Sequence, residues 1–295
     1  MSDVPNRLTV VGERQLTPTQ RKLLSVLTHT LLLAVSVFML YPLLWMLAAS
    51  FRPENEIFSS ASIWPSEWSL DAYARGWNGL RTSFSVFFTN SFIISGLSVL
   101  GNVLACSMAA FAFARLNFKF KNFWFAMMLM TLMLPYQVTL IPQYVLFRQL
   151  GWVNTFLPLV VPKFLAADGF FIFLLVQFFR GLPKELDEAA QMDGCSPWRI
   201  YWKIVMPLSM PVLATGAIFT FIGTWDDFFG PLIYLSEMKT YTVMLGLRTF
   251  TDSTGESDYG GLFAMSVLSL VPIFLFFLFF QRLLIEGIAT TGMKR

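Results

Sequence analysis

Long apolar runs, separated by short polar segments, dominate the chain. They cover Leu23–Phe51, Ser83–Ala114, Asn122–Phe147, Thr155–Phe179, Ile204–Trp225 (continuing to Leu235) and Tyr259–Gln281. Each run is long enough for a helix that crosses a bilayer core, which takes about 20 residues. The pattern therefore predicts an all-α polytopic membrane protein with six transmembrane helices. Charge interrupts only the fourth run, at Lys163 and Asp168.

Composition excludes most other classes of protein. Hydrophobic residues make up 56% of the 295 residues and charged residues 13%, whereas soluble domains carry ~25% charged residues. Two cysteines and one histidine are too few for a disulfide scaffold, a cysteine-rich metal site or most zinc chemistry. A net charge of +3 is too small to indicate nucleic-acid binding. No cleaved signal peptide is expected, because the first apolar run is too long.

The distribution of basic residues predicts the orientation in the membrane. Six crossings leave both termini on one side. If that side is the cytoplasm, the inner segments carry 14 lysines and arginines and the outer segments carry 6. Because positive charge accumulates on the cytoplasmic side, we expect a cytoplasmic N-terminal segment (1–22), a membrane domain (23–285) and a cytoplasmic C-terminal tail (286–295).

The segment between the fourth and fifth runs, residues 181–207, is polar enough to lie outside the bilayer. Pro183 and the acidic residues that follow it favour the first turn of a helix. Gly194 is a typical C-terminal stop. Ser196 and Pro197 then form a cap and a first-turn proline. The segment therefore predicts two short helices joined at an elbow.

Two interpretations of this elbow segment remain open from its residues alone. It is either an amphipathic connector that lies on the lipid headgroups or a knob that docks into a cytoplasmic partner. The small side chains of Ala189 and Ala190 favour a close approach by another surface, and Glu188 could act as a charged anchor.

The residues of the elbow segment also carry a resemblance to a known family. Glu188-Ala189-Ala190, three residues, Gly194, nine residues, Ile204, two residues and Pro207 resemble the signature loop of the integral-membrane subunits of bacterial ABC importers. Met206 stands where the family prefers leucine. Further motifs similar to the carbohydrate-type permeases, of the maltose/oligosaccharide and glycerol-3-phosphate class, occur in the same order along the chain: Asn90-Ser91-Phe92, Ala110–Leu116, Leu134-Pro135, Thr139–Pro142, Leu182–Leu186, Thr224–Phe228 and Gln281-Arg282.

This resemblance implies a non-catalytic permease subunit of an ATP-driven carbohydrate importer in the bacterial inner membrane. It implies a companion permease subunit, two cytoplasmic ATP-binding subunits and an extracytoplasmic solute-binding protein. ATP and Mg would be bound by the partner ATPase, and no cofactor by this chain. The residues that would contact the ATPase are Glu188, Ala189, Ala190, Asp193 and Gly194. The sequence contains no Gly-x-x-x-x-Gly-Lys-Ser/Thr phosphate loop, which also assigns ATP hydrolysis to a partner.

Charged residues within apolar runs are costly and are therefore candidates for function. Asp168, Asp226 and Asp227 are candidates for the translocation path, although the family often has asparagine at the position of Asp226. Structural caps or contacts between subunits would equally explain the pair Asp226 and Asp227. For Lys163 we expect a side chain that extends toward the outer headgroups.

A second class of function is an ion-coupled secondary transporter that uses Asp168, Lys163 and Asp227. It leaves the elbow segment without a purpose, and the six runs show no obvious internal duplication. An intramembrane enzyme is less compatible still, because the chain has one histidine and no Gly-x-Ser-x-Gly elbow. The sequence does not identify the solute.

Overall fold

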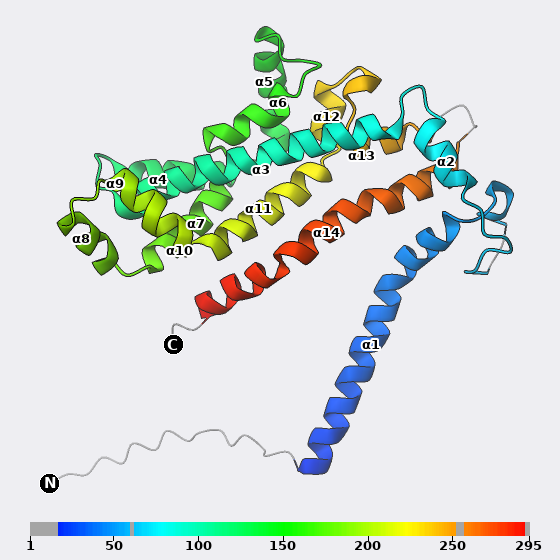
Figure 1. The fold of residues 1–295 in the computed structure, drawn as a ribbon, viewed down its shortest axis with the longest axis horizontal. Coiled ribbons are helices and arrows are strands. Elements are labelled where there is room, and N and C mark those ends of the chain that lie inside the picture. The colour runs from blue at the N-terminus through cyan, green and yellow to red at the C-terminus, as the bar shows by residue number, and fades with distance from the viewer. Residues whose placement is uncertain (1–16, 60–61, 252–256, 293–295) are drawn as a thin grey trace.

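The computed structural model describes residues 17–59, 62–251 and 257–292 (Figure 1). Residues 1–16 and 293–295, which belong to the expected terminal segments, lie outside the described residues. The α-helices are α1 (Pro18–Ala49), α2 (Asp71–Asn78), α3 (Phe84–Arg115), α4 (Lys121–Thr131), α5 (Tyr136–Gln149), α6 (Leu157–Val160), α7 (Gly169–Gly181), α8 (Glu185–Met192), α9 (Pro197–Ile200), α10 (Met206–Leu208), α11 (Met210–Trp225), α12 (Phe229–Tyr234), α13 (Val243–Arg248) and α14 (Tyr259–Gly292). Short 3₁₀ segments (Glu54–Glu56, Val161–Leu165 and Met238–Thr240) and a π segment (Tyr201–Val205) complete the described part.

The structure confirms an all-helical membrane protein, with fewer continuous spans than the sequence predicts. Among the described residues, four segments are long and apolar enough to cross a membrane: Lys22–Ala49, Phe84–Arg115, Leu157–Gly181 and Tyr259–Arg282. A fifth candidate is the pair Pro197–Leu208 and Met210–Trp225, which is bent by 78°. Prolines at positions 207 and 211 flank this bend, and each lacks the backbone N–H that a continuous helix uses.

The third predicted span, Asn122–Phe147, is divided into α4 and α5. These helices have 11 and 14 residues, so neither alone spans about 30 Å of hydrocarbon. The break has a local cause in Pro135, which precedes α5 in an extended conformation. Proline also disfavours helical geometry in the residue before it.

The fourth predicted span is likewise interrupted, between the 3₁₀ segment Val161–Leu165 and α7. Ala166 adopts a left-handed conformation with φ 53°. Asp168 then caps α7, and its Oδ1 accepts a hydrogen bond from the Phe171 backbone N–H at 3.0 Å. The fourth run is thus a candidate span that contains a local break, and both charged residues lie beside this break.

Helix α3 packs against α7 and α11, and α14 packs against the opposite side of α11 (Figure 1). Asn102 joins these helices, since its Nδ2 donates to Asp168 Oδ2 at 3.1 Å and to Thr220 Oγ1 at 2.8 Å. Polar contacts of this kind hold membrane helices together. Figure 1 shows α1 diverging from this bundle, and α1 meets α14 where the Trp45 and Phe263 rings lie 5.4 Å apart.

The contact between α7 and α11 depends on a glycine. A methyl group added to Gly216 would overlap the Phe171 ring, whereas one added to Gly223 would meet nothing within 4 Å. We expect Gly216→Ala to destabilise the protein by about 1–3 kcal/mol, as overpacking does. Thermal unfolding of the purified protein would detect this, with Gly223→Ala on the same helix as the control. Equal unfolding temperatures for the two variants would contradict the close approach.

Candidate functional site: the elbow segment and a cavity between helices

The first helix of the elbow segment is α8, and it ends as its sequence predicts. Gly194 adopts φ 75°, its N–H donates to Gln191 O at 2.9 Å, and the Cys195 N–H donates to Ala190 O at 2.9 Å. This pair of bonds is a Schellman motif, which favours glycine at the left-handed position. The start differs slightly from the prediction, because Pro183 precedes the helix and α8 begins at Glu185.

The second helix also begins as predicted. Ser196 Oγ accepts a hydrogen bond from the Arg199 backbone N–H at 3.4 Å, and Pro197 occupies the first turn. The chain then enters the bundle through the π segment, where Tyr201 is buried and its hydroxyl lies 2.8 Å from Ser107 Oγ on α3. The elbow segment is therefore fixed to the membrane helices at its second half.

The five residues expected to contact an ATPase divide into two groups. Glu188, Ala189, Asp193 and Gly194 are exposed on α8 and at its end. Ala190 is buried and packs into the core that contains Phe179 and Ile200. The small side chain of Ala190 thus lets α8 lie close to the bundle. The other four residues form an exposed surface of α8 and its end.

A buried ion pair, which the sequence analysis did not single out, anchors α8. Arg115, the last residue of α3, lies 3.1 Å from Asp187 on α8, and the side chains are 5% and 14% exposed. Arg115 Nη2 also donates to the backbone carbonyl of Leu182, which follows α7, at 2.9 Å. One guanidinium thus connects the neighbouring ends of three helices. The sequence does contain a sign of this pair. Arg115 and Asp187 carry opposite charges and lie near ends of helices that are predicted on the same side of the membrane.

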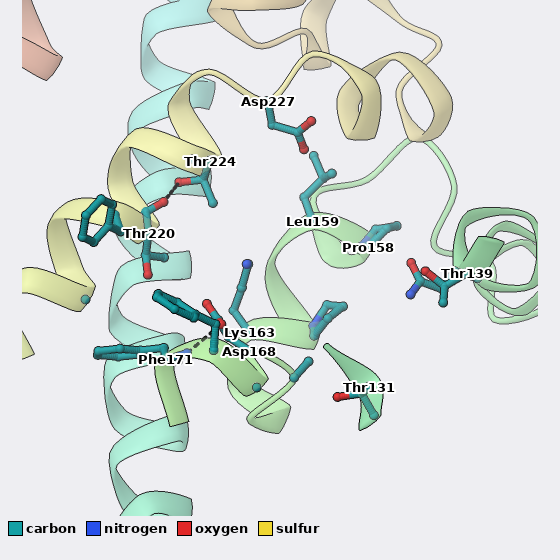
Figure 2. Close-up of a pocket in the computed structure, with 18 of the residues that line it drawn as sticks. Thr131, Thr139, Pro158, Leu159, Lys163, Asp168, Phe171, Thr220, Thr224 and Asp227 are labelled. Carbon is teal, nitrogen blue, oxygen red and sulfur yellow. Dashed lines mark hydrogen bonds between the residues drawn. The ribbon is translucent and has the colours of Figure 1, made fainter. Parts of the chain in front are cut away.

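A cavity of about 830 Å³ opens between α3, α4, α5, α7 and α11 (Figure 2). Its lining combines apolar side chains with hydroxyl, amide and charged groups. The polar lining residues are Thr131, Thr139, Gln143, Lys163, Asp168, Thr220, Thr224, Asp227 and Tyr234. This mixture suits a polyhydroxylated ligand, because sugar rings present both apolar faces and many hydrogen-bonding groups.

Three charged side chains share the cavity. Asp168 is held by Asn102 and by the N-terminus of α7, while Asp227 Oδ1 accepts a hydrogen bond from the Gly230 N–H at 3.0 Å. In Figure 2, Lys163 lies beside Asp168 and extends toward the end of the cavity where Asp227 lies. Lys163 forms no ion pair within 4 Å with a carboxylate of the described residues.

The cavity therefore brings together two of the three predicted path residues. Asp168 and Asp227 line it, whereas Asp226, at the end of α11, is exposed and does not. Lys163 also lines the cavity, and its expected extension toward the outer headgroups stays a prediction. The chain breaks at Ala166, between Lys163 and Asp168, and both side chains line the same space.

The comparison with known families decides what kind of protein this is. Residues 101–289 match the model of the binding-protein-dependent transport system inner membrane component. The chain belongs to this family of ABC importer permeases. The permease is a multi-pass inner-membrane protein and a non-catalytic subunit, and subunits of this family bind no cofactor. This membership leaves no support for the ion-coupled secondary transporter.

Individual relatives agree with the family. The chain is 34% identical over 254 residues to the probable ABC transporter permease protein YurM of Bacillus subtilis, with 86% of this chain and 83% of that one covered. It is 35% identical over 266 residues to the arabinooligosaccharides transport system permease protein AraQ of Halalkalibacterium halodurans, at 88% and 93% coverage. A solved bacterial ABC transporter that imports the acidic polysaccharide alginate matches with a TM-score of 0.79 at 20% identity, covering 90% of this chain and 98% of that chain. That match supports the permease fold.

Proposed function

We propose that this permease subunit forms part of the path for a carbohydrate, which can be a sugar, an oligosaccharide or a polyol. The cavity between α3, α7 and α11 carries the proposal. Its volume of about 830 Å³ falls in the range of small-molecule sites, roughly 300–1,000 Å³. The similarity to a permease for arabinooligosaccharides supports the carbohydrate class.

We propose that α8 couples this subunit to ATP hydrolysis by a separate subunit. The exposed residues Glu188, Ala189, Asp193 and Gly194 would contact a separate ATPase, with Ala190 supporting them from the buried side. Arg115 links α8 to the ends of α3 and α7, and both helices contribute to the cavity wall. A movement of α8 would therefore be passed to the path as a rigid-body movement.

The proposed topology has six crossings with both termini in the cytoplasm. In it, α4 and α5 together make the third crossing, broken at Pro135, since broken helices occur in membranes where they line a cavity. Thr131 and Thr139, on either side of this break, line the cavity. The excess of 14 inner over 6 outer basic residues supports the orientation.

The proposed assembly contains a companion permease subunit, two cytoplasmic ATP-binding subunits and an extracytoplasmic solute-binding protein. Support for the companion comes from α1, which diverges from the bundle (Figure 1) and exposes Leu33 and Phe38 at 69% and 80%. A second permease subunit would cover part of this apolar surface and complete the path.

We expect Glu188→Lys and Gly194→Val to abolish ATP-driven uptake while the subunit stays in the membrane. The first reverses a charge on the exposed face of α8. The second forces a β-branched residue into the left-handed conformation, at a cost of roughly 1–2 kcal/mol. The measurement is uptake of a labelled sugar panel by cells with the wild-type subunit, with each variant and with no subunit.

The matched control is Glu185→Lys, because Glu185 is also exposed on α8 but lies outside the proposed contact. Wild-type uptake by the Glu188→Lys variant would refute the coupling role. If no sugar in the panel requires the subunit, the carbohydrate assignment is wrong.

A further inference from the structure

Three basic side chains gather where α4 and α7 meet at their cytoplasmic-side ends. Lys121 opens α4, Arg180 lies in the last turn of α7, and Lys184 directly precedes α8. Helices α4 and α7 pack against each other, and the Arg180 guanidinium carbon lies 5.2 Å from the centroid of the Phe125 ring. Phe125 follows Lys121 by one helical turn, so the two lie on the same face of α4. Arg180 of α7 therefore lies against the face of α4 that carries Lys121.

This basic cluster (Lys121, Arg180 and Lys184) has no neutralising carboxylate among the described residues. None of the three forms an ion pair within 4 Å, and the nearby Asp187 pairs with Arg115 instead. The Lys121 ammonium donates one hydrogen bond to Leu116 O at 2.8 Å. Lys121 lies just outside the apolar run, and its pKa is lowered by burial and then by the charges of Arg180 and Lys184. An anion bound here would relieve this repulsion.

The start of α4 adds a further attraction for an anion. Phe120, the residue before the helix, is left-handed with φ 59° and offers no side-chain cap to the first turn. The free N–H groups and the positive end of an α-helix favour bound phosphate. The helix has 11 residues, and Lys121 is its first.

An apolar surface continues directly from the cluster along α4. Phe123, Trp124, Met127 and Met130 are 56%, 52%, 44% and 62% exposed and follow the spacing of one helical face. Phe120, beside the cluster, is 76% exposed. Aromatic side chains next to basic ones at a helix end are typical of the membrane–water interface. A soluble phosphate would have no use for this apolar face, whereas a phospholipid would cover it with its acyl chains.

We propose that the basic cluster binds the phosphate headgroup of an anionic phospholipid of the inner leaflet, with the acyl chains along the exposed face of α4. This inference rests on the proposed orientation, in which these helix ends face the cytoplasm. Basic pockets between membrane helices on that side recognise anionic headgroups. The site lies directly beside the anchored α8, so the lipid would stabilise the end of α7 from which the elbow segment departs.

The test uses the assembled importer in nanodiscs that contain phosphatidylglycerol and phosphatidylcholine. Native mass spectrometry measures how much phosphatidylglycerol stays bound to the wild type and to the triple variant Lys121→Gln/Arg180→Gln/Lys184→Gln. Each basic residue near an anionic surface contributes roughly a factor of five, so we expect retention to fall on the order of 100-fold when three are removed. The matched control removes three exposed basic residues of the opposite side, Arg148→Gln/Lys239→Gln/Arg248→Gln, and should retain the lipid.

Three results would overturn the proposal. The first is equal retention of phosphatidylglycerol by the wild type and the triple variant. The second is displacement of the lipid by millimolar inorganic phosphate, which would assign the site to a free phosphate. The third concerns the importer in detergent without anionic lipid. If addition of the ATPase subunit alone protects Lys121 from an amine-reactive reagent, the cluster is a protein contact. Lipid retention is measured independently of uptake. A result that refutes the lipid site is therefore distinguishable from a result of the Glu188→Lys test that refutes the coupling role of α8.

Discussion

Replacing Asp187 by asparagine is expected to reduce ATP-driven uptake at least tenfold, whereas Glu185→Gln leaves it unchanged. Both changes remove one charge from the first turn of α8. Only Asp187 pairs with a guanidinium that is 5% exposed. Leaving one member of a buried pair without its partner costs about 3–5 kcal/mol, and Arg115 holds the ends of α3 and α7 as well. We therefore expect α8 to lose its fixed position.

A variant that removes both members of the pair separates this anchoring role from a loss of folding. The double variant Arg115→Met/Asp187→Leu removes both charges, so its stability should be close to that of the wild type. Met192 is 89% exposed, so a spin label at Met192→Cys reports the mobility of α8, in a Cys195→Ser background because Cys195 is a free and partly exposed thiol. The label should become more mobile in Asp187→Asn and in the double variant. Full uptake by the double variant would show that α8 needs no such anchor.

Gly223→Phe is expected to block uptake almost completely without lowering the amount of protein in the membrane. Gly223 lines the cavity, and nothing lies within 4 Å of a methyl group added there. A phenylalanine side chain would therefore enter the path instead of distorting the helix. Uptake by cells, together with ATP hydrolysis by the purified importer, measures the effect, because a blocked path leaves ATPase binding intact.

Gly96→Phe on α3 is the matched control for the cavity. A methyl group at Gly96 also meets nothing within 4 Å, but Gly96 is not among the residues that line the cavity. We expect normal uptake from this variant. If Gly223→Phe transports as well as Gly96→Phe, the cavity is not the path.

The elbow segment could be predicted closely because its helix ends depend on local chemistry. Gly194 closes α8 through its own backbone conformation, and Ser196 with Pro197 opens α9 through contacts within one turn. Such signals need no information about distant parts of the chain. The elbow segment could therefore be placed before any tertiary contact was known.

The breaks at Ala166 and Pro135 and the pair of Arg115 with Asp187 could not be predicted in the same way. An alanine carries no local signal for a left-handed conformation, so the packing around it decides. Prolines are tolerated in membrane helices, so Pro135 alone did not require two helices. Arg115 and Asp187 meet only once three helix ends are in place. These features depend on contacts between segments far apart in the sequence.

The hydrogen bonds of the Asn102 amide limit which helices can separate when the transport path opens first to one side of the membrane and then to the other. The amide holds Asp168 and Thr220 at once, with distances of 3.1 and 2.8 Å, and so fastens α3 to both α7 and α11 near the cavity. A gate between these three helices would have to break both bonds and leave the fully buried Asn102 amide unpaired, which is expensive. Alternating access is therefore expected to occur where this block of helices meets the neighbouring subunit, with the block tilting as one piece.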